Sequence, residues 1–294
     1  MSLWDAYDPG PEVDMHVSFE FFPPKNAHME ATLWRSVFTL EQLRPRFVSV
    51  TYGADPLTRA RTHSVIERIR ELTRLTAAPH LTCAGETPES IRAALRRYWA
   101  RGIRQLVAVR GDLHDLTLHP DLRYAEDLVK LARSVADFEI AVAAYPETHP
   151  EAPNAAFDIE NLKRKLNSGA ARAITQFFFD NDAFLRFRDR CARAGISSEI
   201  IPGILPITRL DKLRRFAKRC GTTIPNSLDA YFEGLDDDPD TFRILAVNYA
   251  IDQVRQLQRE GVHAFHFYTL NRYDMTYAIC HALGVRPQPV RATA

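Results

Sequence analysis

Short stretches rich in β-branched and aromatic residues recur along the chain, and each is followed by a longer segment with apolar residues at helical spacing. Helical segments such as SIRAALRRYWARG (90–102) and FLRFRDRCARAG (184–195) end in glycine, as helix C-termini often do. Strand and helix therefore alternate throughout the chain. The eight predicted strands are VSFEFF, FVSVTY, HLTC, QLVAVR, EIAVAAY, AITQFFF, EIIPGIL and AFHFYTL.

Eight alternations favour a closed barrel of parallel strands over an open doubly wound sheet. The open sheet often carries a glycine-rich nucleotide loop, and no G-x-G-x-x-G follows any predicted strand. The predicted fold class is therefore α/β, a (β/α)8 TIM barrel. The longest gap lies before the last strand, so we expect extra helices there, the second beginning at the acidic residues 236–238.

The length of the chain suits one such barrel. With 294 residues it slightly exceeds the roughly 250 that a (β/α)8 barrel needs. We expect a single catalytic domain over residues 1–294, with an N-terminal arm at 1–16 and a C-terminal tail at 286–294. No linker long enough to separate a second domain is visible in the sequence.

The balance of charge excludes several classes of partner. Lys plus Arg number 38 and Asp plus Glu number 37, so no net charge favours binding to nucleic acid or to a membrane surface.

No signal peptide is recognisable, and no apolar run approaches the roughly 20 residues that span a bilayer. The four scattered cysteines form no C-x-x-C pair, which disfavours a disulfide framework or structural zinc. We expect a reduced, cytoplasmic protein.

Glu20 lies among aromatic residues in the first predicted strand, VSFEFFPPK (17–25). Burial of an unpaired carboxylate is costly, so the group should be paired, protonated or functional. One interpretation is an inward ion pair with an arginine or lysine of a neighbouring strand. The other is a carboxylic acid that keeps its proton and donates it during catalysis. The aromatic neighbours disfavour the charged form, and we prefer the second interpretation.

Polar residues follow most of the predicted strands. The loops after the strands of a (β/α)8 barrel build its catalytic face, so these side chains should gather at one end. Exposure to solvent would explain any one of them, but their coincidence predicts a site. The residues are Glu20, Thr51, Tyr52, His80, Arg110, Asp112, Tyr145, His149, Gln176, Asn271 and Arg272.

The sequence AVRGDLHD follows the fourth strand and opens an irregular loop that runs to residue 123. Gly111 permits a sharp turn or a close approach to a ligand. Arg110 could hold a phosphate or carboxylate, and Asp112 could accept hydrogen bonds from a heterocycle. A solvated turn with a local Arg–Asp pair is the alternative.

The same loop contains four potential metal ligands. His114, Asp115, His119 and Asp121 lie on one short irregular stretch, whereas metal ligands usually come from converging elements. We therefore expect no metal site.

The segment NLKRKLNSGA places Asn161, Arg164 and Lys165 on the helix after the fifth strand. An ordinary basic helix face is the default interpretation. If a dinucleotide lies across the end of the barrel, the same residues could contact its phosphates and ribose.

Many blocks of the chain, in their order, resemble the methylenetetrahydrofolate reductase family. The resemblance extends over nearly the whole sequence and is strongest to the short bacterial enzymes, which lack a C-terminal regulatory domain. The blocks are VSFEFFPPK, FVSVTYGA, APHLTC, GIRQLVAVRGD, AAYPETHPEA, NLKRKLNSGA, ITQFFFD, RFRDRC, EIIPGILP, FEGLDDD, FHFYTLNR and YAICHALGVRP.

The resemblance implies a (β/α)8 barrel that carries FAD non-covalently. It implies reduction of 5,10-methylenetetrahydrofolate to 5-methyltetrahydrofolate by ping-pong kinetics, with NADH or NADPH as the reductant. Glu20 matches the general acid of the family, and Asp112 matches an aspartate beside the flavin and the pterin. A homo-oligomer is expected by the same analogy.

The resemblance also assigns binding residues. Gln176 matches the side chain that recognises the pterin, and Phe216 matches an aromatic that packs against folate or nicotinamide. Thr51 and Arg272 match further substrate contacts. The residues that match FAD contacts are Tyr52, Ala54, His80, Arg110, Gly111, Asp112, Tyr145, His149, Asp158, Asn161, Arg164 and Lys165.

Two segments depart from the family pattern. The loop at 113–123 differs from the common enterobacterial form, so no FAD contacts are assigned within it. Lys212 stands where close relatives carry Gln near the reductant. It could favour NADPH, although an exposed lysine on a basic helix is the preferred interpretation. The alternatives to the reductase are a folate- or flavin-binding barrel without turnover and a flavin barrel resembling proline dehydrogenase.

Overall fold

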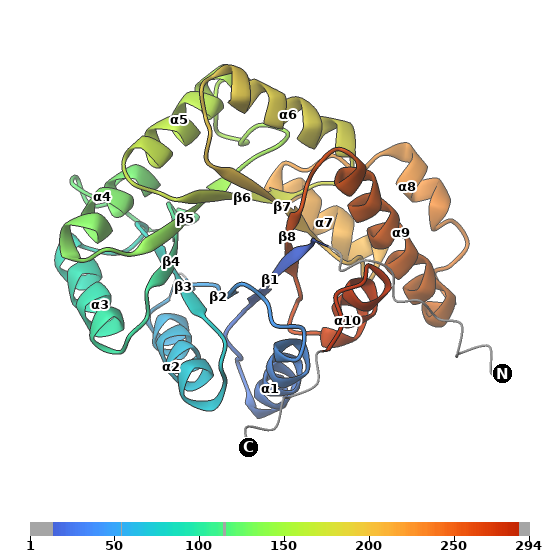
Figure 1. The fold of residues 1–294 in the computed structure, drawn as a ribbon, viewed down its shortest axis with the longest axis horizontal. Coiled ribbons are helices and arrows are strands. Elements are labelled where there is room, and N and C mark those ends of the chain that lie inside the picture. The colour runs from blue at the N-terminus through green and yellow to red at the C-terminus, as the bar shows by residue number, and fades with distance from the viewer. Residues whose placement is uncertain (1–13, 54, 114–115, 288–294) are drawn as a thin grey trace.

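Eight parallel strands close into a barrel, with the helices around its outside (Figure 1). The structure is a computed structural model that describes residues 14–53, 55–113 and 116–287. β1 pairs with both β2 and β8, and these two pairings close the sheet. The predicted (β/α)8 fold of the α/β class is confirmed. Residues 1–13 and 288–294, which make up most of the predicted arm and tail, lie outside the described residues.

Each predicted strand has its counterpart in the barrel. The strands are β1 (His16–Phe21), β2 (Val48–Val50), β3 (Ala77–Thr82), β4 (Gln105–Val109), β5 (Glu139–Ala144), β6 (Arg172–Phe177), β7 (Glu199–Ile204) and β8 (Ala264–Tyr268). The helices from β1 to β6 are α1 (Ala27–Glu41), α2 (Pro56–Leu72), α3 (Pro88–Ala100), α4 (Ala125–Val135) and α5 (Ala155–Asn167). Those after β6 are α6 (Asn181–Arg193), α7 (Leu210–Cys220), α8 (Asn226–Tyr231), α9 (Pro239–Arg259) and α10 (Tyr273–Ala282).

The start of β3 differs from the expected one. The strand begins at Ala77, three residues before the predicted HLTC, and it includes Pro79. Proline lacks the N–H that a ladder needs and is disfavoured inside strands. Here Pro79 lies opposite Val50, the last residue of the short strand β2, where the ladder to that neighbour ends.

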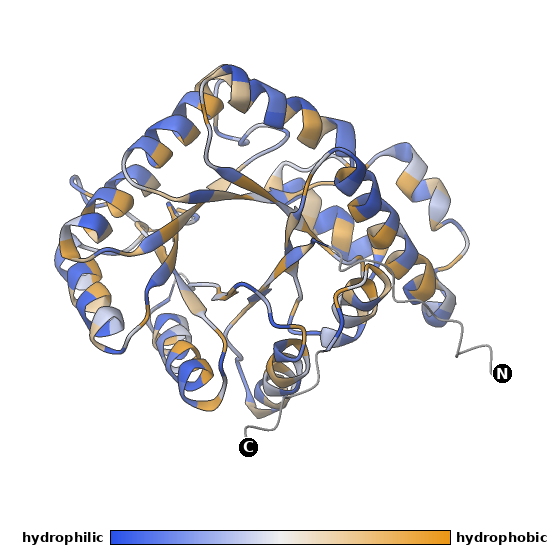
Figure 2. Cartoon of the chain, viewed as in Figure 1, coloured by the Kyte–Doolittle hydropathy of each residue, from blue (hydrophilic) through white to orange (hydrophobic). Residues whose placement is uncertain are grey.

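The barrel has two apolar layers. Outward-facing strand residues pack against the helices in the largest cluster, which includes Phe19 and Phe267. The helices carry hydrophobic and hydrophilic residues around their circumference, as their half-buried position requires (Figure 2). A separate small cluster, which contains Ala78, Val107 and Ala141, follows the strands around the ring. We assign it to the inside of the barrel, which is therefore packed and not a pore.

Two additional helices lie between β7 and β8, as expected. α8 and α9 follow α7, and the three pack through a second cluster that includes Leu213 and Phe232. Asp238 caps α9 by accepting a hydrogen bond from the backbone N–H of Thr241 at 3.0 Å. The acidic run therefore begins this helix, which confirms the prediction made from it.

Charged side chains close the end of the barrel at which the strands begin. Arg172, the first residue of β6, forms ion pairs with Glu139 and Glu199, which open β5 and β7. Arg46 also pairs with Glu199, at 2.6 Å. This end lies opposite the loops that follow the strands, so we expect it to contribute stability and not chemistry.

Within residues 14–53, 55–113 and 116–287, no helix combines the length and the apolar character needed to cross a bilayer.

Candidate active site

Glu20 projects from β1 into the barrel, where two imidazoles flank its carboxylate. Nε2 of His80 on β3 lies 3.3 Å from Oε2 of Glu20, and Nε2 of His266 on β8 lies 3.7 Å from the same oxygen. The side chains are 18%, 12% and 0% exposed for Glu20, His80 and His266. Among the described residues these ionisable partners are imidazoles, not the arginine or lysine of an ordinary ion pair.

His266 is held in place by contacts from both sides. Its Nδ1 lies 2.7 Å from Oγ of Ser18, and its ring stacks on Phe47 with 5.6 Å between centroids. Ser18 precedes Glu20 by two positions, so both project from the same face of β1. His266 and Ser18 are not among the residues predicted from the sequence. The sequence does contain a feature that could have indicated His266. It is a polar residue within the aromatic strand AFHFY, just as Glu20 is a polar residue within VSFEF.

Burial lowers the pKa of His80, and it outweighs the opposite effect of the neighbouring Glu20. His266 also lowers the pKa of His80. The imidazole is therefore neutral at neutral pH, and its contact with Glu20 is not an ion pair. A neutral imidazole can exchange a proton with a carboxyl group, so this pair is equipped for acid–base chemistry.

We expect stability to fall as the pH is lowered, because burial lowers the pKa of three histidines, His63, His80 and His149. Below about pH 6.5 the unfolded chain binds protons that the folded chain does not, so folding weakens. Each histidine can add at most about 1.4 kcal/mol per pH unit. Urea unfolding at pH 7 and pH 5 measures the fall, and His63→Gln should make it shallower. An unchanged or steeper fall in this variant would contradict the assignment.

The loop after β4 places Arg110, Gly111 and Asp112 at the end of the barrel where the strands finish. Arg110 forms a two-pronged contact with the carboxylate of Glu151, at 2.6 and 2.8 Å. This contact raises the pKa of Arg110 and lowers that of Glu151. Gly111 has φ +84°, which fits the predicted sharp turn. Asp112 is exposed, and its negative charge contributes to the raised pKa of Arg110.

Tyr145 and His149 pack edge to face after β5, with 4.5 Å between their ring centroids. The backbone N–H of His149 donates to Asp158 on α5 at 2.8 Å, so the carboxylate fixes this loop to the helix. Burial raises the pKa of Tyr145 to about 12, which keeps its phenol protonated. The structure therefore brings together three of the predicted residues.

The remaining predicted residues on α5 point in different directions. Lys165 points toward the barrel, where Nζ donates to the carbonyl oxygen of Ala143 at 2.5 Å, and burial lowers its pKa to about 8. Arg164 is exposed and contacts Asn161 and, at 3.5 Å, Glu126. Lys165 is thus more than part of an ordinary basic helix face, whereas Arg164 is consistent with one.

Gln176 and Phe216 both contact Phe177. The ring of Phe216 on α7 stacks on Phe177 with 5.0 Å between centroids, and Oε1 of Gln176 accepts from the Phe177 N–H at 3.1 Å. Phe216 remains 39% exposed, which leaves part of its ring accessible. Lys212, one turn earlier on α7, is exposed, in agreement with the preferred interpretation of this residue.

Thr51 and Arg272 lie at the same end of the barrel. The Thr51 N–H donates to the carbonyl oxygen of Phe21 at 2.9 Å, which places it beside the end of β1. Arg272 is the N-cap residue of α10, and its guanidinium lies 3.6 Å from Asp274. More than half of the Arg272 side chain is exposed, so it is accessible to a ligand.

Three predicted or considered residues, Ala54, His114 and Asp115, lie outside the described residues. In the described part of the chain, no group of three or more His, Cys, Asp or Glu side chains could hold a metal ion. The described part of the loop after β4 is irregular, apart from one bridge between His119 and Leu122. FAD contacts in that loop stay unassigned.

The residues at this end fit a dinucleotide cofactor. Nε2 of His80 and Nε2 of His266 are buried and make no hydrogen bond to any described residue. Such an atom is costly unless a water molecule or a ligand atom satisfies it. Arg110 and Lys165 add cationic donors at the same end, and these suit the pyrophosphate of a dinucleotide.

Comparison with known proteins gives a consistent result. Residues 9–284 match the family model for methylenetetrahydrofolate reductase. The chain is 56% identical to the 5,10-methylenetetrahydrofolate reductase of Escherichia coli K12 over 273 residues, which cover 93% of this chain and 92% of that protein. It is also 32% identical to methylenetetrahydrofolate reductase (NADH) 1 of Arabidopsis thaliana, over 91% of this chain and 48% of the plant protein.

Solved structures of low identity share the fold. A Clostridium thermocellum protein that binds two copies of 5-methyl-5,6,7,8-tetrahydrofolic acid superposes with a TM-score of 0.63 at 16% identity, covering 93% of this chain and 95% of that one. The dihydropteroate synthase of Xanthomonas albilineans gives a TM-score of 0.52 at 15% identity, with 94% of each chain covered. Both likenesses concern the fold alone.

Proposed function

This chain belongs to the methylenetetrahydrofolate reductase family, and on that premise we propose that it reduces 5,10-methylenetetrahydrofolate to 5-methyltetrahydrofolate. The family match extends over residues 9–284, and the 56% identity to the E. coli enzyme covers nearly the full length of both chains. The observation within the chain that carries the proposal is Glu20, a carboxyl group inside the barrel between His80 and His266.

FAD, held non-covalently, is the proposed cofactor, with NADH or NADPH as the reductant. When bound, it would take a hydride from the nicotinamide and pass it to the folate in two alternating, ping-pong half-reactions. The cationic side chains of Arg110 and Lys165 would bind its phosphates. The further residues proposed to hold it are Tyr52, Ala54, His80, Gly111, Asp112, Tyr145, His149, Asp158, Asn161 and Arg164.

Glu20 acts in this proposal as the general acid. Its carboxyl group donates a proton to the nitrogen that leaves the one-carbon unit when the five-membered ring of the folate opens. The electrons of the broken C–N bond stay on that nitrogen, while the lone pair of the other nitrogen bonded to this carbon forms the C=N⁺ bond of an iminium ion. The carbon of this ion can accept hydride. His80 lies 3.3 Å from the carboxylate and is neutral, so it does not hold Glu20 as the anion of an ion pair.

The remaining residues orient the reactants. Asp112 would hydrogen-bond the pterin, and its charge would make a neighbouring flavin a better hydride donor. The exposed ring of Phe216 offers a stacking surface for folate or nicotinamide, and Gln176 lies one residue from its stacking partner Phe177. Thr51 and Arg272 complete the proposed substrate contacts. The enzyme is proposed to be cytoplasmic, since its four scattered cysteines form no C-x-x-C pair, and to be homo-oligomeric by the resemblance to the family.

The visible spectrum of the purified protein tests this function. We expect a flavin band that bleaches on anaerobic addition of NADH or NADPH and returns on addition of 5,10-methylenetetrahydrofolate. A band that bleaches but does not return would favour a binding barrel without turnover. Bleaching by proline would favour the proline-dehydrogenase-like alternative, and a colourless protein that binds no added FAD would refute the flavoenzyme.

A further inference from the structure

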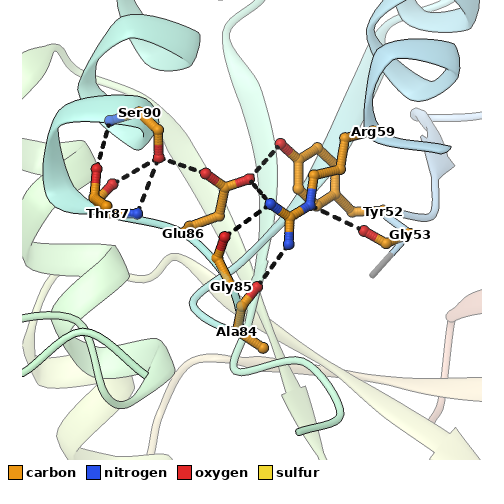
Figure 3. A network of polar contacts seen from close by, with 8 residues as sticks. All are labelled: Tyr52, Gly53, Arg59, Ala84, Gly85, Glu86, Thr87 and Ser90. Atoms are coloured by element: carbon orange, nitrogen blue, oxygen red, sulfur yellow. Dashed lines mark hydrogen bonds and ion pairs between the residues drawn. The ribbon is translucent and has the colours of Figure 1, made fainter. Parts of the chain in front are cut away.

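A buried ion pair joins the start of α2 to the loop that follows β3 (Figure 3). Nη1 of Arg59, at the start of α2, lies 2.7 Å from Oε1 of Glu86, just before α3. The two side chains are 12% and 8% exposed. Glu86 is not among the residues that the family resemblance implies. A buried pair persists only when its other donors and acceptors are also satisfied, so its surroundings are informative.

The guanidinium of Arg59 donates hydrogen bonds to three backbone carbonyl oxygens. It donates to Gly85 and Ala84 at 2.9 Å each and to Gly53 at 3.3 Å (Figure 3). Gly53 belongs to the loop after β2, whereas Ala84 and Gly85 belong to the loop after β3. A Cβ on Gly85 would lie 2.7 Å from Nη2 of Arg59, and φ at this position is +69°. Glycine therefore permits the close approach, and Arg59 fastens one loop to the other.

The carboxylate of Glu86 is fully engaged as well. Oε1 accepts from the hydroxyl of Tyr52 at 3.1 Å, and Oε2 accepts from the hydroxyl of Ser90. Ser90 is fixed in turn by Thr87, since each side chain accepts from the backbone N–H of the other at the start of α3 (Figure 3). Glu86 is thus held from two sides and presents one oxygen to Tyr52.

The phenol of Tyr52 acts as the donor in this contact. Burial and the neighbouring Glu86 raise its pKa well above the ordinary value, so it keeps its proton. The guanidinium carbon of Arg59 lies 5.6 Å from the centroid of the Tyr52 ring, and the ring of His63 packs against it edge to face at 5.7 Å. The direction of the phenol is therefore set by its neighbours and not by solvent.

We propose that Glu86 is a positioning residue that fixes Tyr52 at the cofactor-binding end of the barrel, with Arg59 holding Glu86 in place. Tyr52 directly follows β2 and the substrate-side residue Thr51, so its orientation bears on the site. The inference rests on the proposed function, because it takes Tyr52 as a contact of FAD. It adds a residue and an ion pair that the family pattern does not supply.

A double-mutant cycle tests the coupling. The dissociation constant for FAD is measured by flavin fluorescence on the apoprotein of wild type, Tyr52→Phe, Glu86→Ala and the double variant. We expect each single variant to bind FAD about tenfold more weakly than wild type, as for one lost hydrogen bond. The dissociation constant of the double variant should not exceed that of the single variant that binds FAD more weakly. Glu86→Gln keeps an acceptor for Tyr52 and should recover part of the affinity.

Glu67→Ala is the matched control. Glu67 on α2 is 14% exposed and pairs with Arg97 and Arg101 at 2.6 and 3.0 Å, so it also joins α2 to the α3 region. No hydrogen bond between Glu67 and Tyr52 is present in the described structure. The control should lower thermal stability and leave FAD affinity unchanged. If Glu86→Ala behaved in the same way, or if the two losses were additive, the positioning role would be overturned.

A readout without flavin separates this inference from the proposed function. In apoprotein labelled with 3-fluorotyrosine, Tyr52→Phe identifies the ¹⁹F resonance of Tyr52 among the ten tyrosines. Both Glu86→Ala and Glu86→Gln should shift that resonance, while Glu67→Ala should not. An unmoved resonance would overturn the positioning of Tyr52 by Glu86. A wild-type protein that binds no FAD would refute the proposed function itself.

Discussion

Replacing Glu20 with glutamine is expected to leave reduction of the flavin by NADH or NADPH largely intact and to slow reduction of the folate by about a thousandfold. Loss of a general acid typically costs two to four orders of magnitude in rate, about 10²–10⁴. Glutamine preserves the shape of the side chain between His80 and His266 but carries no acidic proton. Only the half-reaction that needs the proton should therefore suffer.

Anaerobic stopped-flow spectroscopy separates the two half-reactions in the Glu20→Gln variant. The bleaching of the flavin band reports the first, and its return on addition of 5,10-methylenetetrahydrofolate reports the second. Glu199→Gln, at the opposite end of the barrel, is the control and should leave both rates near those of wild type. A comparable loss in both half-reactions of Glu20→Gln would show that Glu20 serves binding or folding and not proton donation.

The architecture could be predicted from the sequence because it depends on local periodicity. Alternating strands and amphipathic helices leave few arrangements that bury every apolar face, and the eightfold repeat selects the closed barrel. Asp238 illustrates the local character of such signals, since its capping of α9 needs only the adjacent residues. The start of β3 was missed because Pro79 is disfavoured in a strand, and only the short length of β2 makes it acceptable.

The partners within the site could not be predicted in this way. Glu20 and His266 are 246 positions apart and meet because β1 closes the ring against β8, so the contact depends on tertiary pairing. The same holds for Arg110, whose two-pronged contact is with the carboxylate of Glu151 in the loop after the next strand. Strand ends indicate which residues gather at one face, but not which of them touch.

The ionic cluster of Arg172, Glu139 and Glu199 lies at the end of the barrel where the strands begin, and we expect it to stabilise the fold. Arg172 is 10% exposed and lies between the carboxylates of Glu139 and Glu199, with its guanidinium carbon 5.6 Å from the centroid of the Phe47 ring. Without the arginine, these two carboxylates, which are 41% and 37% exposed, would keep their charge next to an unfilled cavity. Breaking a buried pair by removing one partner typically costs about 3–5 kcal/mol.

Because the carboxylates of this cluster remain partly exposed to water, we expect Arg172→Ala to lower the free energy of unfolding by about 3 kcal/mol, the low end of that range. Urea unfolding at pH 7 measures the loss. Arg46→Ala is the matched control, since Arg46 is 35% exposed where it pairs with Glu199 and should cost about 1 kcal/mol or less. Both variants should keep the wild-type rates of the two half-reactions at temperatures where they are folded, because the cluster lies at the end opposite Glu20. A slowed half-reaction in folded Arg172→Ala, or equal losses of stability in the two variants, would contradict this separation of stability from chemistry between the two ends of the barrel.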